Sequence, residues 1–179
     1  LNMAKLFLPV ILGTGRAGRM SEAPAKFIVA ELARAGFETE LVDVRDYPLT
    51  ATARAKENKM AAAWAKIAAR ADGFVIVTPE YNHGYPGELK LFLDGAYAEY
   101  AKKPLGLVGV SAGPFGGVRV VEQLRLVAIE LSLVPVRNAL YVSNVMGPQD
   151  EKALAERAAP MIADLKWYAT ALKAAREKL

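Results

Sequence analysis

The chain has 179 residues but no cysteine, and its only histidine is His83. Without cysteine it cannot form disulfides, thiolate zinc sites or iron–sulfur clusters, and it cannot use a thiolate nucleophile. A single imidazole also excludes any metal site that requires two histidines. The sequence therefore excludes the chemistry of thiol enzymes and of most zinc enzymes.

Long apolar runs and blocks of basic residues are also missing. The apolar stretch Leu6–Leu12 is much shorter than the roughly 18–20 residues of a membrane span. The 23 Lys and Arg and 19 Asp and Glu give a net charge of +4, and basic residues alternate with acidic ones as on solvated helix faces. We therefore expect a cytoplasmic protein with no membrane and no nucleic-acid partner.

The residues present suit one compact domain over residues 1–179, in which short apolar runs alternate with amphipathic ones. Strands are expected at Leu6–Leu12 (well paired only from Pro9 or Val10), Phe37–Val44, Gly73–Thr78, Leu105–Val110 and Val134–Val142. Helices are expected from Ser21 to Gly36, over 57–71, from Gly87 to about Ala101, from Val118 to about Leu131 and from about Asp150 to Lys178.

This alternation predicts a three-layer α/β fold. Helices between successive strands favour parallel pairing with right-handed crossovers, so helices cover both faces of the sheet. The continuous apolar run Phe74–Val77 agrees with burial on both sides. We expect a five-stranded, doubly wound parallel sheet in the order 2-1-3-4-5.

Unusual loops follow the first, third and fourth expected strands. In the order 2-1-3-4-5 these strands are neighbours, and ligands of such sheets bind beyond the carboxyl ends of the strands, where the strand order reverses. The three loops are therefore expected to form a single site.

The first loop contains the pattern G-x-G-x-x-G at Gly13, Gly15 and Gly18, and Asp43 closes the second strand. A Rossmann-type NAD-binding protein is one interpretation of this spacing. The late helix start at Ser21 counts against it, and so does the short chain, which cannot also hold a substrate domain.

The polar residues of the first loop instead indicate a phosphate monoester. Thr14 and Ser21 supply hydroxyl groups, and Arg16 and Arg19 supply guanidinium groups, next to a helix N-terminus where anions are favoured. An ordinary turn with incidental basic residues is the alternative.

The second and third loops favour a flat, uncharged heterocycle. The segment Pro79–Gly87 is rich in aromatic and amide groups, and its Asn82 can pair with an imide edge. The segment Ser111–Gly117 offers backbone N–H groups at the opposite side of the same pocket. A phosphate monoester and a planar heterocycle together describe FMN.

At these residues the chain resembles the NADPH-dependent FMN reductase family of flavodoxin-like proteins, which includes quinone, azo and chromate reductases. The resemblance rests on Gly13-Thr14-Gly15-Arg16, on the P-E-Y-N-x-x-x-P-G block at Pro79–Gly87 and on S-A-G-P-F-G-G at Ser111–Gly117. It implies a flavodoxin-like fold, FMN as cofactor and NADPH or NADH as hydride donor. The implied cofactor-binding residues are Thr14, Gly15, Arg16, Arg19, Met20, Ser21, Pro79, Glu80, Tyr81, Asn82, Ser111 and Gly113.

The resemblance further implies two half-reactions at one site, with no side chain required as acid or base and no metal. The expected partner is a small electron acceptor: a flavin, quinone, azo compound or metal oxyanion. A homodimer or homotetramer is expected, with the aromatic segment Tyr85–Tyr100 as the candidate interface. A flavodoxin-type electron carrier remains the alternative from another functional class, although such carriers are strongly acidic.

Overall fold

A computed structural model describes residues 5–178 of the chain. Its parallel sheet runs in the order β2 (Leu41–Asp43), β1 (Val10–Leu12), β3 (Phe74–Pro79), β4 (Pro104–Val110) and β5 (Val134–Pro135). A sixth strand, β6 (Leu140–Val142), also pairs with β4. The predicted order is therefore confirmed. No helix in the described part of the chain is long and apolar enough to cross a membrane, and the cytoplasmic location stays a prediction.

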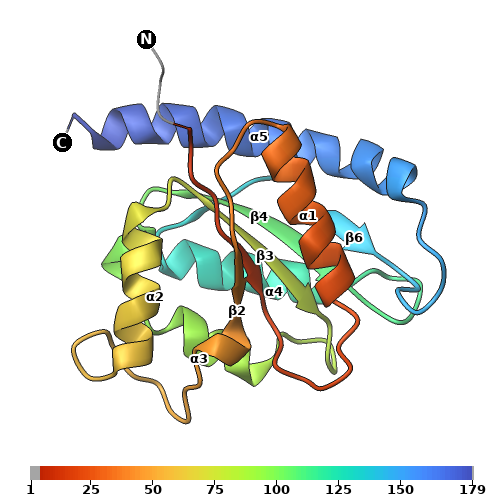
Figure 1. The fold of residues 1–179 in the computed structure, drawn as a ribbon, viewed down its shortest axis with the longest axis horizontal. Helices are drawn as coiled ribbons and strands as arrows, with labels where there is room; N and C mark the ends of the chain where they lie inside the picture. Colours follow the sequence, from red (N-terminus) through yellow and green to blue (C-terminus); the bar gives the residue numbers. More distant parts are fainter. Residues whose placement is uncertain (1–4, 179) are drawn as a thin grey trace.

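The elements alternate as the sequence indicates (Figure 1). The strands are β1 (Val10–Leu12), β2 (Leu41–Asp43), β3 (Phe74–Pro79), β4 (Pro104–Val110), β5 (Val134–Pro135) and β6 (Leu140–Val142). The α-helices are α1 (Glu22–Arg34), α2 (Lys59–Arg70), α3 (Gly87–Leu93), α4 (Val118–Glu130) and α5 (Glu151–Arg176), with 3₁₀ turns η1 (Val44–Asp46) and η2 (Ala98–Tyr100).

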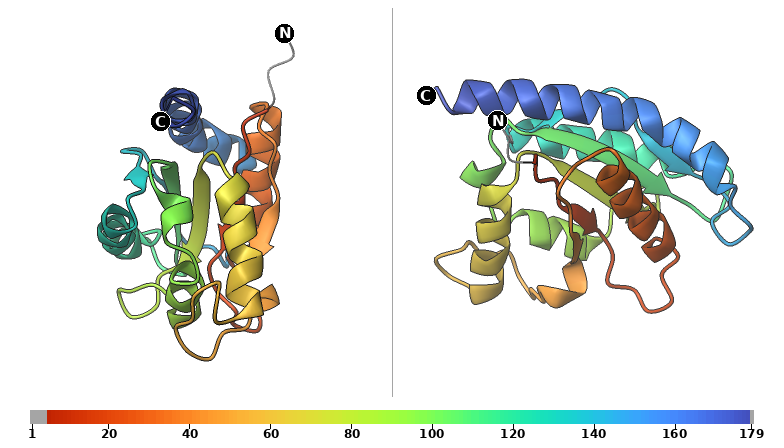
Figure 2. Two further views of the ribbon diagram at one scale, coloured as in Figure 1. Left: turned by 90° about the vertical axis from the view of Figure 1, so that its left-hand side faces the viewer. Right: turned by 45° about the horizontal axis from the view of Figure 1, so that its top comes forward.

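Two apolar layers hold the helices onto the sheet. On one face α1 and the long α5 pack on side chains such as Val75 and Val108, and on the other face α2, α3 and α4 pack on Ile76 and Leu107. Helix α5 runs along one side of the molecule in both figures (Figures 1 and 2). Strands β3 and β4 are buried along their whole length, as expected for central parallel strands.

The single strand predicted over Val134–Val142 is wrong, because the segment forms two strands. Leu105 of β4 pairs with Pro135, but Val108 pairs with Leu140, so extra residues bulge between β5 and β6. The Arg125 guanidinium of α4 donates to the carbonyl oxygens of Val136 and Arg137 at 2.8 Å each. These bonds hold the backbone of the bulge outside the ladder.

The helix predicted from Gly87 to Ala101 is also wrong in extent, because α3 ends at Leu93. The Tyr100 hydroxyl donates to the Leu93 carbonyl at 2.8 Å and accepts from Trp64 Nε1 at 2.7 Å. The Leu93 carbonyl thus accepts a hydrogen bond from a side-chain hydroxyl, and not from a backbone N–H of a further helical turn. Phe92 and Tyr100 are core residues, so these two cannot contribute to the interface expected over Tyr85–Tyr100, whereas Tyr97 of the same segment is 62% exposed.

Candidate functional site

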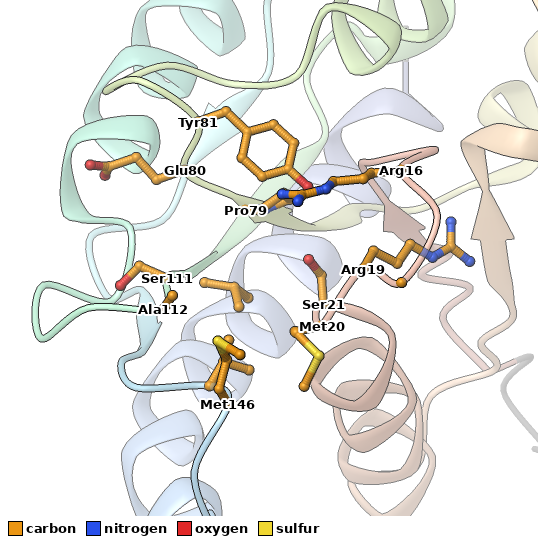
Figure 3. A pocket seen from close by; sticks show the side chains of 13 residues that line it. Arg16, Arg19, Met20, Ser21, Pro79, Glu80, Tyr81, Ser111, Ala112 and Met146 are labelled. Atoms are coloured by element: carbon orange, nitrogen blue, oxygen red, sulfur yellow. The ribbon is translucent and has the colours of Figure 1, made fainter.

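A pocket of about 360 Å³ lies beyond the carboxyl ends of β1, β3 and β4. Its walls come from the three loops singled out in the sequence and from the segment between β6 and α5 (Figure 3). The lining residues are Arg16, Gly18, Arg19, Met20, Ser21, Pro79, Glu80, Tyr81, Val110, Ser111, Ala112, Val145 and Met146. The three loops therefore meet at one pocket, as the sequence predicts, and the volume of this pocket is typical of small-molecule sites.

Arg16 and Ser21 form the polar end of this pocket. Ser21 precedes the 13-residue helix α1, and its hydroxyl makes no hydrogen bond to the helix. This hydroxyl is therefore available to bind an anion at the helix N-terminus. The exposed Arg16 guanidinium lies 5.8 Å from the centre of the Tyr81 ring. Among the described residues no carboxylate pairs with Arg16, so its charge is free to meet an anion.

Arg19, by contrast, is committed to the protein itself. Its guanidinium donates to the carbonyl oxygen of Thr14 at 2.6 Å. The same guanidinium donates to both carboxylate oxygens of Asp43, with which it forms an ion pair. Figure 3 shows this guanidinium turned away from Ser21 and the pocket centre. The expectation that Arg19 binds the phosphate is therefore not supported, and Asp43 is a partner of Arg19 rather than a ribose ligand.

Asp43 is held ionised by this arrangement. Burial alone would raise its pKa, but hydrogen bonds from Arg19 and Arg45 outweigh that effect and hold the pKa well below its usual range. The Arg19 side chain is only 3% exposed, so the ion pair fixes the first loop against the end of β2.

Thr14 and Gly15 do not line the pocket. The Gly15 N–H and the Thr14 hydroxyl donate to the same oxygen of Glu88, Oε1, at 2.8 and 3.1 Å. Sequence reasoning did not single out Glu88. Only its place in the first turn of the expected helix, next to the P-E-Y-N block, could have drawn attention to it.

The second loop is a tight turn. Tyr81 and Gly84 exchange backbone hydrogen bonds of 2.9 Å, and Asn82 and His83 between them have φ of 49° and 68°, as in a type I′ turn. This turn places Pro79, Glu80 and Tyr81 on the pocket wall, whereas the exposed Asn82 stands at its tip and does not line the pocket.

The Glu80 carboxylate accepts hydrogen bonds from the first turn of α4. Its oxygens accept from the Arg119 and Val120 N–H groups at 3.0 and 3.3 Å and from the Arg119 guanidinium at 3.0 Å. Burial opposes ionisation, but these bonds outweigh it and lower the pKa of Glu80. Its carboxylate therefore points away from the pocket (Figure 3).

The third loop folds back on β4. Ser111 Oγ donates to the Gly113 carbonyl and accepts from the Gly116 N–H, each at 2.8 Å. A Cβ on Gly109 would lie 2.6 Å from the carbonyl oxygens of Gly116 and Gly117, so this close approach requires glycine. Ser111 lines the pocket, whereas Gly113 does not.

Val110, Ala112, Val145 and Met146 complete the pocket, and sequence reasoning missed them. Ala112 lies within the quoted third motif, and Val110 directly precedes that motif. Val145 and Met146 follow β6, where no pattern of polar or glycine residues marks a site. Met20 and Met146 are 46% and 75% exposed, and their side chains lie toward the same side of the pocket in Figure 3.

These residues fit FMN. An unpaired guanidinium and a free hydroxyl at a helix N-terminus suit its phosphate. The wall of Pro79, the Tyr81 ring, Ala112 and Val145 is apolar enough to cover a planar ring system. No cluster of three or more potential metal-binding side chains occurs in residues 5–178.

Fold and pocket together define a doubly wound α/β protein with a pocket at the reversal of strand order. The family model for NADPH-dependent FMN reductase matches residues 8–147. The chain belongs to this family, which confirms the resemblance found in the sequence and decides against the Rossmann interpretation.

Relatives with assigned activities agree. An NAD(P)H-dependent FMN reductase of Schizosaccharomyces pombe is 36% identical over 144 residues, which cover 73% of this chain and 70% of the relative. A 2-hydroxy-1,4-benzoquinone reductase of Burkholderia sp is 33% identical over 72% of this chain and 73% of its own length. An NADPH azoreductase of a Bacillus species is 31% identical over 96% of this chain and 97% of its own length.

The fold also matches solved structures. The flavoenzyme NAD(P)H:(acceptor) oxidoreductase FerB of Paracoccus denitrificans superposes with a TM-score of 0.73 over 91% of this chain and 98% of FerB. Its sequence identity is 19%, so this likeness shows the fold alone.

Replacing Asp43 with Asn tests the anchoring of the first loop. We expect Asp43→Asn to lower the free energy of unfolding at neutral pH by roughly 2–4 kcal/mol, because the buried Arg19 charge would keep only its longer ion pair with Glu22, at 3.4 Å. A lowered carboxyl pKa contributes stability above about pH 4 that is lost as pH falls through the folded-state pKa. Urea unfolding from pH 7 to pH 2 should therefore show a constant difference down to about pH 4 and a difference that shrinks progressively from there toward pH 2. A constant difference at all pH values would contradict the ion pair.

Proposed function

We propose that this oxidoreductase passes hydride from NAD(P)H through FMN bound in the pocket to a small electron acceptor. The proposal is carried by one observation: a cationic and hydroxyl-bearing end faces an apolar wall in a pocket at the reversal of strand order. Family membership and relatives named as FMN, quinone and azo reductases support it.

Arg16 and Ser21 are the proposed phosphate ligands, together with the free N–H groups that open α1. Met20 adjoins them on the same segment and lines the pocket with an apolar side chain. Pro79, Glu80, Tyr81, Ser111 and Ala112 would cover the ring, mainly through backbone and apolar atoms, since the Glu80 carboxylate and the Ser111 hydroxyl are bonded within the protein.

The redox chemistry, hydride uptake and the release of two electrons to the acceptor, would be supplied by the bound FMN. The side chains bind, orient and exclude water. We assign no catalytic acid or base: Glu80 is fixed at the start of α4, and Asp43 is paired with Arg19 and Arg45. Because Arg19 is committed to Asp43, Arg16 is the proposed cationic contact for the NAD(P)H phosphates as well.

A planar apolar acceptor such as a quinone or an azo compound is the acceptor that the pocket favours. The exposed side chains of Met20 and Met146 form a thioether rim at the pocket. Methionine adapts to aromatic ligands of different shapes.

A homodimer or homotetramer is also proposed, with α4 replacing Tyr85–Tyr100 as the candidate interface. Leu126 and Ile129 of α4 are 75% and 69% exposed, and Phe115 just before α4 is 61% exposed. Exposed large apolar side chains grouped on one element are typical of interaction surfaces.

Replacing Arg16 tests the phosphate end. We expect Arg16→Ala to weaken FMN binding by about tenfold or more, because a charge-assisted hydrogen bond to phosphate is lost. Binding of riboflavin, which lacks the phosphate, should not change. Quenching of flavin fluorescence measures both affinities, and Arg137→Ala serves as control because Arg137 is exposed and away from the pocket. Equal weakening of FMN and riboflavin would contradict the assignment.

Replacing Met146 tests the acceptor class. Met146→Gln keeps the length of the side chain but makes the rim polar. We expect kcat/KM for benzoquinone to fall about fivefold, whereas the rates with ferricyanide and with NADPH in the reductive half-reaction stay unchanged. A uniform loss with both acceptors would show that Met146 acts on the fold rather than on the acceptor.

Charging α4 tests the interface. Leu126→Glu should shift the molar mass measured by light scattering toward the 19.3 kDa of one chain, since a buried carboxylate in an apolar interface is costly. Ala171→Glu on the exposed side of α5 is the matched control and should leave the mass unchanged. A wild-type protein that is already a monomer would contradict the proposal.

A further inference from the structure

Two carboxylates of the chain hold donors of the first loop that could otherwise bind an anion. Asp43 takes the Arg19 guanidinium. Glu88, in the first turn of α3, takes the Gly15 N–H at 2.8 Å and the Thr14 hydroxyl at 3.1 Å. The loop that carries the phosphate-binding motif is therefore largely satisfied by the protein itself.

The hydrogen bonds of Thr14 leave it no donor to spare. Its hydroxyl accepts from the Arg16 N–H at 3.3 Å and lies 3.3 Å from the Tyr81 hydroxyl. A hydroxyl has a single proton, and the Glu88 carboxylate, which can only accept, takes it. Tyr81 must then donate its hydroxyl proton to Thr14, and Thr14 donates its own to Glu88. Neither hydroxyl therefore has a proton left for another acceptor. Thr14 is fully buried, and no other donor of its side chain can reach a phosphate.

Glu88 differs from Asp43 in how firmly it is held. Asp43 has two guanidinium partners, whereas no Lys, Arg or His in residues 5–178 forms an ion pair with Glu88. Glu88 is also only half-buried, so its carboxylate can turn into water at little cost. An unpaired negative charge beside the loop must lower the affinity of that loop for a phosphate, which is close to doubly negative.

We propose that Glu88 sets the affinity for FMN by competing with the phosphate for the Gly15 N–H and the Thr14 hydroxyl. Its charge keeps FMN weakly bound and exchangeable, so that the flavin can leave as well as serve as a resident cofactor. This inference rests on the proposed function, because it assumes that FMN binds at the first loop.

Two substitutions at Glu88 separate competition from support of the loop. Glu88→Gln removes the charge but keeps an oxygen that can accept from Gly15 and Thr14, and Glu88→Ala removes both. We expect Glu88→Gln to bind FMN about tenfold more tightly than the wild type, and Glu88→Ala at least as tightly. Raising the salt concentration should shrink these differences, because the charge is partly exposed.

The readout is the dissociation constant from quenching of FMN fluorescence, with riboflavin as the ligand that lacks phosphate. Glu177→Gln is the control for net charge, because Glu177 is exposed at the C-terminal end of α5 and does not line the pocket. Circular dichroism and thermal unfolding confirm that each variant folds. Tighter FMN binding in both Glu88 variants, with riboflavin and Glu177→Gln unchanged, supports the proposal.

Four results would overturn it. Weaker FMN binding by Glu88→Ala with unchanged binding by Glu88→Gln would make Glu88 a support of the loop. Unchanged affinity in both variants, or an equal gain for riboflavin, would show that the Glu88 charge does not act on the phosphate. If neither the wild type nor any variant binds FMN, the proposed function fails first, which distinguishes that outcome from the other three.

Discussion

Parallel pairing of β1, β3 and β4 is the constraint on which the site depends. Because these strands run in one direction, their carboxyl ends meet at one edge of the sheet, and the loops that follow them meet there too. The strand order reverses between β1 and β3, so the connecting helices diverge to opposite faces and leave room for a ligand. Residues far apart in the chain, such as Ser21, Tyr81 and Ser111, thereby line one pocket.

Most polar side chains around this pocket make hydrogen bonds or ion pairs within the protein and are not open to a ligand. Glu80 begins α4, Ser111 closes the third loop, and Arg19 ties the first loop to β2. These bonds hold the loops in shape before a ligand arrives, which lowers the cost of ordering them on binding. Arg16 and Ser21 remain as the polar groups open to a ligand, and they mark the end of the pocket where an anion belongs.

The sequence predicted the sheet order, most of the helices and the convergence of the three loops, because hydrophobic periodicity and βα alternation are local signals. It failed where distant side chains decide the outcome. Tyr100 ends α3 through the Leu93 carbonyl, and Arg125 splits the last strand through two carbonyls. Likewise, motif residues such as Thr14, Arg19 and Asn82 could be identified as polar, but their partners Glu88 and Asp43, or their place at a turn tip, depend on tertiary structure.

The most direct test of the account is the visible absorbance of the purified protein, loaded with FMN, when NADPH is added without oxygen. The account predicts that FMN binds, that its absorbance bleaches at a rate fast enough to sustain turnover, and that benzoquinone restores it. Binding of FMN without bleaching by either NADPH or NADH would contradict the assignment as a reductase and would favour an electron carrier.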